Sequence, residues 1–373
     1  PQIAYYRILV LLVYVVVALI DNIRSKTLPQ FFKASAILAV ISVIAVFSHA
    51  TTLMATNEYS KVSIRGKSEL PFDKGNKTSG LDKDYATRWS YGQQETFSLF
   101  IPNIKGGASG YISEDRDLLD AVEDRQMVQS IAQSPRYWGN QPFTSGPVYV
   151  GAIVFFLFML GLFIIPGRLK WALFIATILS ILLAWGKNFP AFTNFFLDHF
   201  PLYNKFRAVS MTLVIAELTI PILAFLALGK IFEKPKIIFE KASILGWKLQ
   251  KIVLAFILTG GVAFFFILAP GLVDLTKENE RQQIEKAVTN QVTQSALQQG
   301  QQPDMQQVNA MVSNWLPGYM NELENVRKKI VRKDAWRSFI YILLAAALLY
   351  FVARRQKFNP ALVTIVLGLL ILI

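Results

Sequence analysis

Segment 81–96, LDKDYATRWSYGQQET, places charged, aromatic and amide side chains close together. Aromatic faces can cover the C–H surface of a sugar while carboxylates, amides and guanidinium groups bond to its hydroxyls. We therefore expect this segment to bind a sugar or the molecule that accepts it. The alternative is a loop that is held together by its own salt bridges. The candidate binding residues here are Arg88, Trp89, Tyr91 and Glu95.

Segment 136–151, RYWGNQPFTSGPVYVG, is a second mixture of this kind and leads into a long apolar run. Tyr and Trp often sit at a membrane surface as simple anchors, and that is the alternative here. The neighbouring arginine, amides and glycines make the segment denser in polar groups than an anchor needs. Tyr137 and Trp138 are therefore further candidates for binding sugar or acceptor.

Segment 198–207, DHFPLYNKFR, carries two cations just before another apolar run. The guanidinium of Arg207 can bind a phosphate through two parallel hydrogen bonds, and Lys205 adds a second positive charge. We expect both residues to bind the phosphate of a lipid donor, with Asn204 beside them as a sugar or acceptor ligand. The alternative is a pair of side chains that extend their charges to the membrane surface.

Several other kinds of chemistry lack their residues in this sequence. It has no phosphate-binding G-x-x-x-x-G-K-[ST] motif, no H-E-x-x-H and no G-x-S-x-G. His49 and His199 are its two histidines and it has no cysteine, so neither a disulfide nor a histidine-rich metal site is expected. Glu217 falls inside an apolar run, where we expect a buried, hydrogen-bonded strut, with a proton relay as the alternative.

The elements that must position these segments are membrane-spanning helices. Hydrophobic residues make up 53% of the 373, and they form long blocks. A helix needs roughly 20 mainly apolar residues to cross a bilayer. The sequence therefore predicts an all-α polytopic membrane protein with about eight spans, at 3–20, 34–55, 148–166, 171–185, 208–228, 251–273, 339–353 and 360–373.

Clusters of basic residues lie in every second loop between these spans, as the positive-inside rule requires of cytoplasmic loops. Clusters of Lys and Arg follow the first, third, fifth and seventh spans. The remaining loops, 56–147, 186–207 and 274–338, are then extracytoplasmic. Loop 56–147 has 11 Lys and Arg against 12 Asp and Glu, so the net charge of +13 does not indicate nucleic-acid binding.

Five regions follow from this topology. Residues 1–55 form two transmembrane helices, 56–147 an extracytoplasmic loop domain, and 148–273 four transmembrane helices with an outer interfacial segment at 186–207. Residues 274–338 form a Gln-rich helical extracytoplasmic loop, and 339–373 form two transmembrane helices, the last one cut short. Because the chain begins at Pro1 and ends in an apolar run, we expect a fragment of a longer protein.

Within the loops we expect three helices and one modification motif. A serine followed by acidic residues predicts a helix over 113–131. The break QGQQP at 299–303 predicts two amphipathic helices in the second large loop. Asn76-Lys77-Thr78 fits the N-glycosylation sequon, a short pattern of little specificity.

Three motifs resemble the YfhO family of bacterial polytopic membrane proteins. They are LDKDYATRWSYG at Leu81–Gly92, YWGNQPFTSGPVYVG at Tyr137–Gly151 and FPLYNKFRAVSM at Phe200–Met211. The resemblance extends from the first outer loop through the fifth span, and the hydropathy pattern agrees over the rest. It implies a protein of the bacterial cytoplasmic (inner) membrane.

YfhO proteins look like members of the GT-C superfamily of glycosyltransferases, which use polyprenyl-phosphate sugars on the extracytoplasmic face. The resemblance implies transfer of a sugar from such a donor to a cell-envelope polymer or lipid. The partners would be the bilayer, the lipid-linked sugar and the envelope acceptor, without nucleic acid and with no certain cofactor. In such enzymes an acidic residue in the first outer loop is the catalytic base, so we expect it before Pro1.

In the expected reaction an acceptor hydroxyl attacks the anomeric carbon and polyprenyl phosphate leaves, assisted by a carboxylate base. Positive charge at Arg207 and Lys205 would stabilise the leaving phosphate. Two alternatives remain open. One is a transporter or flippase of lipid-linked saccharide, which would use the helix irregularities at Pro221 and Gly260-Gly261. The other is a non-catalytic assembly partner for envelope proteins.

Overall fold

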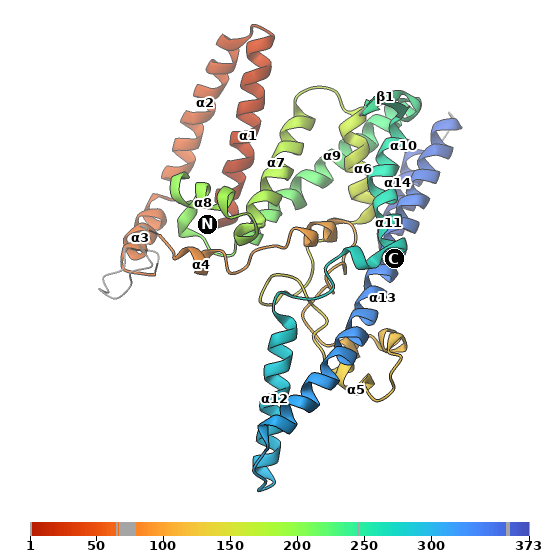
Figure 1. Cartoon of the computed structure of the whole chain (residues 1–373). Helices are drawn as coiled ribbons and strands as arrows, with labels where there is room; N and C mark the ends of the chain where they lie inside the picture. The colour runs from red at the N-terminus through yellow and green to blue at the C-terminus, as the bar shows by residue number, and fades with distance from the viewer. Residues whose placement is uncertain (1, 65, 67–79, 245, 356–358, 373) are drawn as a thin grey trace. The chain divides into compact units, whose positions relative to one another are not determined.

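A computed structural model describes residues 2–64, 66, 80–244, 246–355 and 359–372 (Figure 1). The predicted sequon at 76–78 lies outside these residues. The chain divides into two compact units. Unit 1 comprises Pro1–Gln93, Val154–Ala255 and Ala347–Ile373, and unit 2 comprises Gln94–Ile153 and Phe256–Ala346.

Unit 1 holds most of the apolar helices and one β-hairpin. Its α-helices are α1 (Gln2–Arg24), α2 (Leu28–Phe47), α3 (Ala50–Lys61), α4 (Lys83–Ala86), α6 (Ala152–Ile164), α7 (Leu169–Ala184), α8 (Pro190–His199), α9 (Val214–Glu233), α10 (Lys251–Phe256) and α14 (Pro360–Leu372). Antiparallel strands β1 (Lys241–Ile244) and β2 (Trp247–Gln250) pair Lys241 with Gln250. Short 3₁₀ turns cover Gly186–Asn188, Tyr203–Lys205, Val209–Leu213 and Pro235–Phe239.

Unit 2 is built around one long helix and a loop-rich segment. Its α-helices are α5 (Val128–Ala132), α11 (Val262–Leu268), α12 (Glu280–Gln298) and most of α13 (Met305–Arg354), whose last turns belong to unit 1. A π-helical turn at Ile257–Gly261 precedes α11. Its 3₁₀ turns are Gln94–Leu99, Ile112–Glu114, Arg116–Ala121 and Pro270–Leu272.

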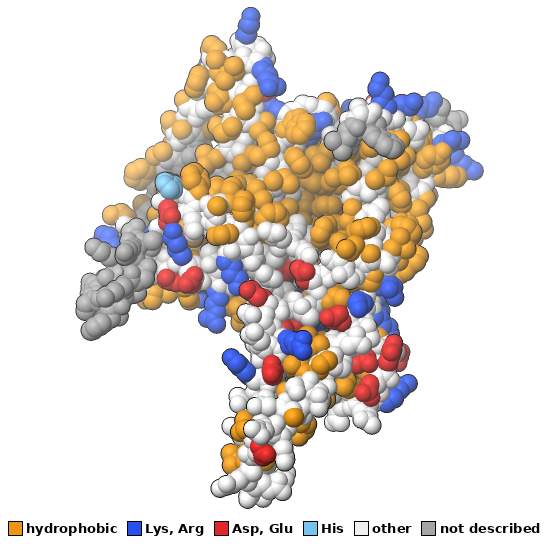
Figure 2. Space-filling model, viewed as in Figure 1, with side chains coloured by type: hydrophobic (Ala, Val, Ile, Leu, Met, Phe, Trp, Pro, Cys, Tyr) orange, Lys and Arg blue, Asp and Glu red, His pale blue; other side chains and the backbone are white. Residues whose placement is uncertain are grey.

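Five helical stretches in the described part of the chain are long and apolar enough to cross a membrane: Gln2–Arg24, Leu28–Phe47, Val209–Glu233, Lys251–Leu268 and Met305–Arg354. Three shorter apolar helices cover Ala152–Ile164, Leu169–Ala184 and Pro360–Ile371. Figure 2 shows hydrophobic side chains over the sides of α1 and α2, and no residue of α2 is buried. An all-α chain with these helices is of the kind that is embedded in a membrane.

The second apolar helix ends earlier than predicted. α2 stops at Phe47 instead of continuing to 55, and the polar helix α3 begins at Ala50. The Ser48 hydroxyl donates to the carbonyl oxygen of Ala45 at 2.7 Å, a local bond that competes with the helix ladder. Polar residues concentrated just after Phe47 therefore divide the predicted span.

The centre of unit 1 is the packing of α7 against α9. Small side chains let the two helices approach, and the hydroxyl groups of Thr177 and Thr219 bond to each other at 2.7 Å. Both threonines are buried, so each satisfies the polar group of the other. Glu217, on the same helix α9, is exposed and lies in its first turn, so the predicted buried strut is wrong. It lies two residues, about half a helical turn, before the buried Thr219, so it points away from the buried face.

The centre of unit 2 is one face of α13. Polar side chains on this face receive or donate hydrogen bonds that fix the segment 94–153. The Asp334 carboxylate accepts from the backbone N–H of Asn103 at 2.6 Å, and the Ser338 hydroxyl donates to the carbonyl oxygen of Phe100 at 2.7 Å. Asp334 and Ser338 are buried one helical turn apart, so they form a continuous stripe.

The predicted helix over 113–131 is wrong. That stretch forms two 3₁₀ turns and the short helix α5 instead. The buried Glu322 carboxylate of α13 accepts from the backbone N–H groups of Glu123 and Asp124, at 2.9 and 3.2 Å. These tertiary bonds use N–H groups that a helix would need for its own ladder, and they override the local helix signal.

The two helices predicted in the second large loop are confirmed. α12 ends at Gln298 and α13 begins at Met305, on either side of the QGQQP break. The second helix does not stop before the apolar run at 339, since α13 is continuous for 50 residues.

Candidate functional site

Two of the three sequence motifs lie side by side in unit 1. The backbone N–H of Leu81 donates to the carbonyl oxygen of Asn204 at 2.9 Å. Further along, the N–H of Ala208 donates to Ala86 at 3.1 Å and the N–H of Ser210 donates to Trp89 at 3.1 Å. We call the paired segments 81–92 and 198–211 the paired-motif cluster.

Side chains reinforce this pairing at its beginning. The Asp82 carboxylate caps α4 by accepting from the backbone N–H of Tyr85 at 2.9 Å. Lys83 and Asp198 form an ion pair at 2.7 Å, with both side chains 38% exposed. The cap fixes the start of α4, and the ion pair ties α4 to the end of α8.

Arg207 is exposed at the surface of this cluster. One guanidinium nitrogen donates to the Tyr85 hydroxyl at 3.0 Å, and the carbonyl oxygen of Arg207 accepts from the Gln2 side chain at 2.7 Å. A guanidinium group has five N–H donors. Among the residues that the structure describes, the neutral Tyr85 hydroxyl accepts one of them, and no acid pairs with Arg207, which leaves charge and donors for an anion. Lys205, which is half-buried, lies two residues before it.

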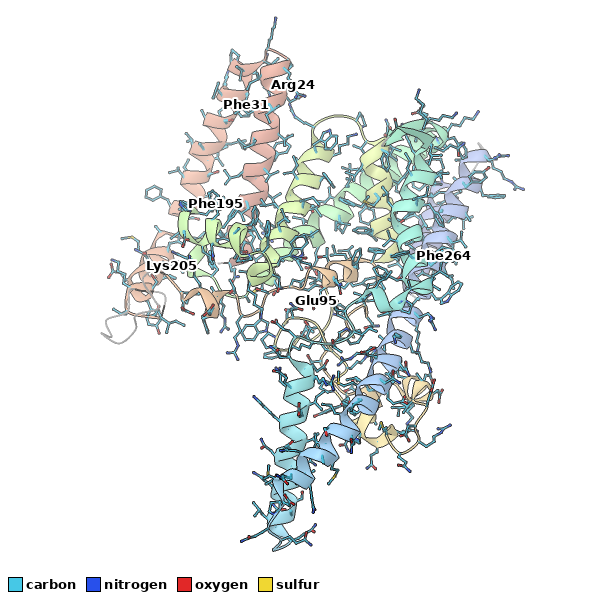
Figure 3. The ribbon with its side chains drawn as sticks, in the orientation of Figure 1. Arg24, Phe31, Glu95, Phe195, Lys205 and Phe264 are labelled. Carbon is cyan, nitrogen blue, oxygen red and sulfur yellow. The ribbon has the colours of Figure 1, made fainter. Side chains whose placement is uncertain are left out.

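The first turns of α1 contact the paired-motif cluster. The Tyr5 hydroxyl donates to the carbonyl oxygen of Pro201 at 2.6 Å, and its ring lies 5.0 Å from the ring of Phe206. Figure 3 shows Lys205 near this end of unit 1 and Arg24 at the far end of α1. The phosphate candidates therefore lie beside the beginning of α1.

Two residues of the cluster have a left-handed backbone although neither is glycine. Leu202 has φ +63° and Ala208 has φ +59°. Such conformations cost on the order of 1 kcal/mol or more each and persist where the surroundings impose them. At Ala208 the backbone N–H is held by the carbonyl oxygen of Ala86. Arg207 therefore lies between two sharp changes of chain direction, at Leu202 and Ala208.

Arg88 and Trp89 form an exposed cation–π pair. The Arg88 guanidinium lies 5.6 Å from the centre of the Trp89 ring, and Arg88 is exposed while Trp89 is half-buried. A charged group on an aromatic plate at a surface can contact both the hydroxyls and the C–H face of a sugar. These are the predicted sugar-binding residues that the structure leaves accessible.

Tyr91 and its neighbours instead form a buried junction. Tyr91 is 2% exposed, and its backbone N–H donates to Ala184 at the end of α7. The buried Ser90 hydroxyl accepts from the N–H of Lys187 at 2.8 Å. Gly186 has φ +50° and a Cβ there would lie 2.0 Å from the Ser90 oxygen, so the junction requires glycine.

The third motif belongs to unit 2, where Glu95 and Tyr137 are buried together. The Tyr137 hydroxyl donates to one Glu95 oxygen at 2.6 Å, and the backbone N–H of Asn140 donates to the other at 3.1 Å. Burial raises the pKa of Tyr137 above its ordinary value, and the adjacent Glu95 charge raises it further. A Cβ at Gly139 would lie 2.2 Å from Glu95, so the motif is tightly packed.

Trp138 is 1% exposed and its indole N–H donates to the carbonyl oxygen of Asp274 at 3.0 Å. The same oxygen accepts from the Lys105 ammonium at 2.7 Å. Burial lowers the pKa of Lys105 to about 8, although the charges of Asp274 and Glu95 oppose the shift. Tyr137, Trp138 and Glu95 thus support the interior of unit 2, and the structure offers no exposed face of them to a sugar.

Arg327 is a central residue of unit 2 that sequence reasoning missed. It is fully buried on α13, pairs with Glu280 through two hydrogen bonds of 2.7 Å, and lies 5.1 Å from the centre of the Trp138 ring. Burial raises the pKa of Glu280, but the bonds and charge of Arg327 outweigh it, so the net shift is downward. The surrounding sequence, ENVRKK, is rich in charged residues as a solvent-exposed helix face is, so the sequence does not indicate that Arg327 is buried.

Within the described ranges, no group of three or more His, Asp or Glu side chains is placed to hold a metal ion. The paired-motif cluster combines exposed cations with an aromatic plate. Of its acidic residues, Asp82 and Asp198 are engaged by Tyr85 and Lys83, and Asp84 is exposed. That arrangement can bind an anion beside a carbohydrate.

No known protein family, curated protein or solved structure matches this chain. The resemblance to the YfhO family therefore depends on the three motifs alone, and it stays a prediction.

Proposed function

We propose that the chain belongs to a membrane-embedded glycosyltransferase of the YfhO and GT-C type. It would transfer a sugar from a polyprenyl-phosphate donor to a cell-envelope polymer or lipid on the extracytoplasmic face. The observation that carries this proposal is the pairing of two distant motifs around an exposed arginine, Arg207, whose only described side-chain partner is the neutral hydroxyl of Tyr85.

The proposed topology has eight spans. The five long apolar helices and the three shorter ones each overlap one of the eight predicted segments, which supports this topology. With Lys and Arg on the cytoplasmic side, the end of α1 that carries Arg24 is cytoplasmic, and the end that carries Gln2 is extracytoplasmic. The paired-motif cluster, bonded to Gln2, then lies at the outer surface, where a lipid-linked donor presents its phosphate.

Arg207 and Lys205 would bind the donor phosphate. In the transfer, a bond forms between the acceptor oxygen and the anomeric carbon while the bond from that carbon to the phosphate oxygen breaks. The acceptor proton passes to a carboxylate base, which we assign to no residue of this chain. Because negative charge grows on the leaving phosphate, a fixed guanidinium beside it lowers the barrier.

The sugar or acceptor would contact the exposed pair Arg88 and Trp89. Asn204 holds the two motif segments together through its carbonyl oxygen, and a Cβ at Gly80 would lie 2.5 Å from its side chain. We assign Asn204 a positioning role in addition to the predicted ligand role. Glu95, Tyr137 and Trp138 belong to unit 2 and pack its interior.

The test uses the full-length protein in proteoliposomes with a radiolabelled polyprenyl-phosphate sugar and envelope-lipid acceptors. Arg207→Ala should lower transfer by about a hundredfold, since removing a donor that stabilises transition-state charge costs about that much. The matched control is Arg125→Ala, another exposed arginine on the same proposed side. Equal activity of both variants and the wild type would exclude the phosphate role of Arg207.

One observation favours a second candidate, a flippase of lipid-linked saccharide. The π-helical turn at Ile257–Gly261 interrupts a membrane helix, and such irregularities are frequent at functional sites. The same proteoliposomes separate the two functions. Movement of label between leaflets without transfer to any acceptor would favour the flippase.

A further inference from the structure

A groove runs along α1 and α7 in unit 1, from the end of α1 that carries Arg24 to Phe200 in the paired-motif cluster. It consists of two adjoining pockets of about 510 Å³ and 280 Å³ that share Val17, Ile20 and Ile175. α1 contacts the unit 1 core through Tyr6 and Leu9 near its beginning. Near its end the Asp21–Arg168 ion pair joins it to the start of α7, and the groove lies between these two attachments.

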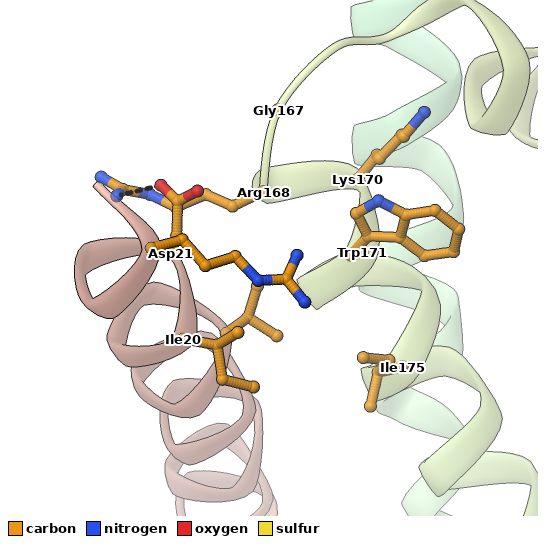
Figure 4. A pocket seen from close by; sticks show the side chains of 9 residues that line it. Ile20, Asp21, Gly167, Arg168, Lys170, Trp171 and Ile175 are labelled. Atoms are coloured by element: carbon orange, nitrogen blue, oxygen red, sulfur yellow. Dashed lines mark hydrogen bonds and ion pairs between the residues drawn. The ribbon is translucent and has the colours of Figure 1, made fainter. Parts of the chain in front are cut away.

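The mouth of the groove is positively charged. It is lined by the cations Arg24, Arg168 and Lys170 and by one acid, Asp21 (Figure 4). Asp21 pairs with Arg168 at 3.0 Å across the mouth. Within the part of the chain that the structure describes, Arg24 forms no ion pair. The mouth therefore carries a net positive charge with no acid left to neutralise it.

A second cation of the mouth, Lys170, is held in place by neutral partners. The Lys170 ammonium donates to the carbonyl oxygen of Leu162 at 3.0 Å and lies 5.4 Å from the centre of the Trp171 ring. Trp171 is 52% exposed at the mouth. An exposed tryptophan beside cations is typical of the depth at which lipid glycerol and headgroups lie.

Beyond the mouth the groove is apolar. Its walls are formed by Leu12, Val16 and Ile20 from α1 and by Ile175 and Leu179 from α7, and Phe200 closes its far end. From Leu9 to Ile20 the groove follows α1 for roughly 17 Å at 1.5 Å per residue. One leaflet of the hydrocarbon core is about 15 Å thick, so the apolar part matches one lipid tail.

We propose that this groove binds one phospholipid with an anionic headgroup, its phosphate at Arg24 and Lys170 and one acyl chain along α1. Charge complementarity selects this occupant: the mouth is cationic, the walls are apolar, and both features lie on the same two helices. On the proposed topology the mouth faces the cytoplasmic leaflet, where anionic lipids are concentrated. The binding requires the chain to be in a bilayer, and it does not depend on glycosyl transfer.

The test measures which lipid touches Trp171. The full chain is reconstituted in phosphatidylcholine vesicles with increasing mole fractions of brominated phosphatidylglycerol, or of brominated phosphatidylcholine. Bromine quenches nearby tryptophan, and the difference between wild type and Trp171→Phe isolates this one residue. We expect the anionic probe to quench Trp171 at severalfold lower mole fraction than the neutral probe.

Two variants separate the headgroup contact from general surface charge. Arg24→Gln should reduce the preference for phosphatidylglycerol about fivefold, since a cation near a lipid surface contributes about that much to anionic-lipid binding. Lys33→Gln is the matched control, because it removes an exposed cation from α2 that does not line the groove. An equal loss in both variants would mean that surface potential alone attracts the lipid, and would overturn the proposal.

A third variant tests the tail. Val17→Phe fills the shared middle of both pockets without changing charge, so it should reduce quenching by both probes. Equal quenching of Trp171 by the two probes in the wild type would overturn the headgroup assignment. No quenching by either probe would show that protein, either another segment or a second copy, occupies the groove.

Discussion

The guanidinium of Arg207 donates to the Tyr85 hydroxyl at 3.0 Å, although the two residues are 122 positions apart in the chain. Tyr85 lies in α4, and Arg207 lies between two residues of left-handed backbone. Through this contact a residue of segment 81–92 orients Arg207, the exposed cation of segment 198–211.

The first prediction concerns the orientation of the Arg207 side chain. Tyr85→Phe removes one hydrogen-bond acceptor and leaves the charge, so it should weaken donor binding about fivefold, the effect of roughly 1 kcal/mol. In the transfer assay the change should appear as a higher KM with kcat nearly constant. Tyr59→Phe, at an exposed site on α3, is the control. A loss of kcat at constant KM would show that the hydroxyl acts in the reaction and does not only orient Arg207.

The second prediction concerns the junction at Gly186. Gly186→Ala should destabilise unit 1 by about 2 kcal/mol or more, since it forces a side chain into left-handed backbone and onto Ser90 and Val209. A lower melting temperature in detergent measures the effect. Gly229→Ala is the control, because a Cβ there meets no atom within 4 Å. If both variants melt alike, the close approach at Gly186 does not stabilise the fold.

The third prediction concerns the buried pair of unit 2. Arg327→Ala should destabilise the protein by about 3–5 kcal/mol because it leaves the largely buried Glu280 carboxylate without its partner. Lys328→Ala, whose pair with Glu324 is partly exposed, should cost about 1 kcal/mol at most. The pair also predicts an acid limit. Because the folded pKa of Glu280 is lowered, its stabilisation is complete above the ordinary value of 4.5 and is lost as the pH falls through the folded pKa.

The fourth prediction concerns Lys105. Its folded pKa of about 8 lies below the ordinary 10.5, so between these values the unfolded chain binds more protons than the folded one. Stability should therefore rise from pH 8 toward pH 10.5, by up to about 1.4 kcal/mol per pH unit. The melting temperature measured across this range should lose the slope in Lys105→Met. An unchanged slope in that variant would assign the titration to another group.

The sequence predicted the apolar helices well because hydrocarbon thickness sets their length. It failed where polar side chains choose between local and distant partners. Ser48 ends α2 through a local bond, whereas Glu322 takes the N–H groups that a helix over 113–131 would have used. Neither choice is visible in hydropathy.

The candidate site was only half predictable for a related reason. Each motif was recognisable from its own residues, but nothing in either one indicates that Leu81 meets Asn204 or that Tyr85 meets Arg207. At the motif Tyr137–Gly151 and at Glu95, which bonds to it, burial decides the role. Trp138 and Glu95 have the composition expected of a sugar site and the surroundings of a protein core.

The bonds between segments 81–92 and 198–211 also have a consequence for biosynthesis. The ribosome adds about 5–20 residues per second, so after Tyr85 emerges roughly 6–24 s pass before Arg207 is made. For most of that interval the first segment lacks its described backbone partners in other segments, which lie at Ala184 and beyond. A nascent chain that stalls before Arg207 would therefore expose an unpaired, aromatic-rich strand of backbone, which is the kind of feature that chaperones and quality-control proteases recognise.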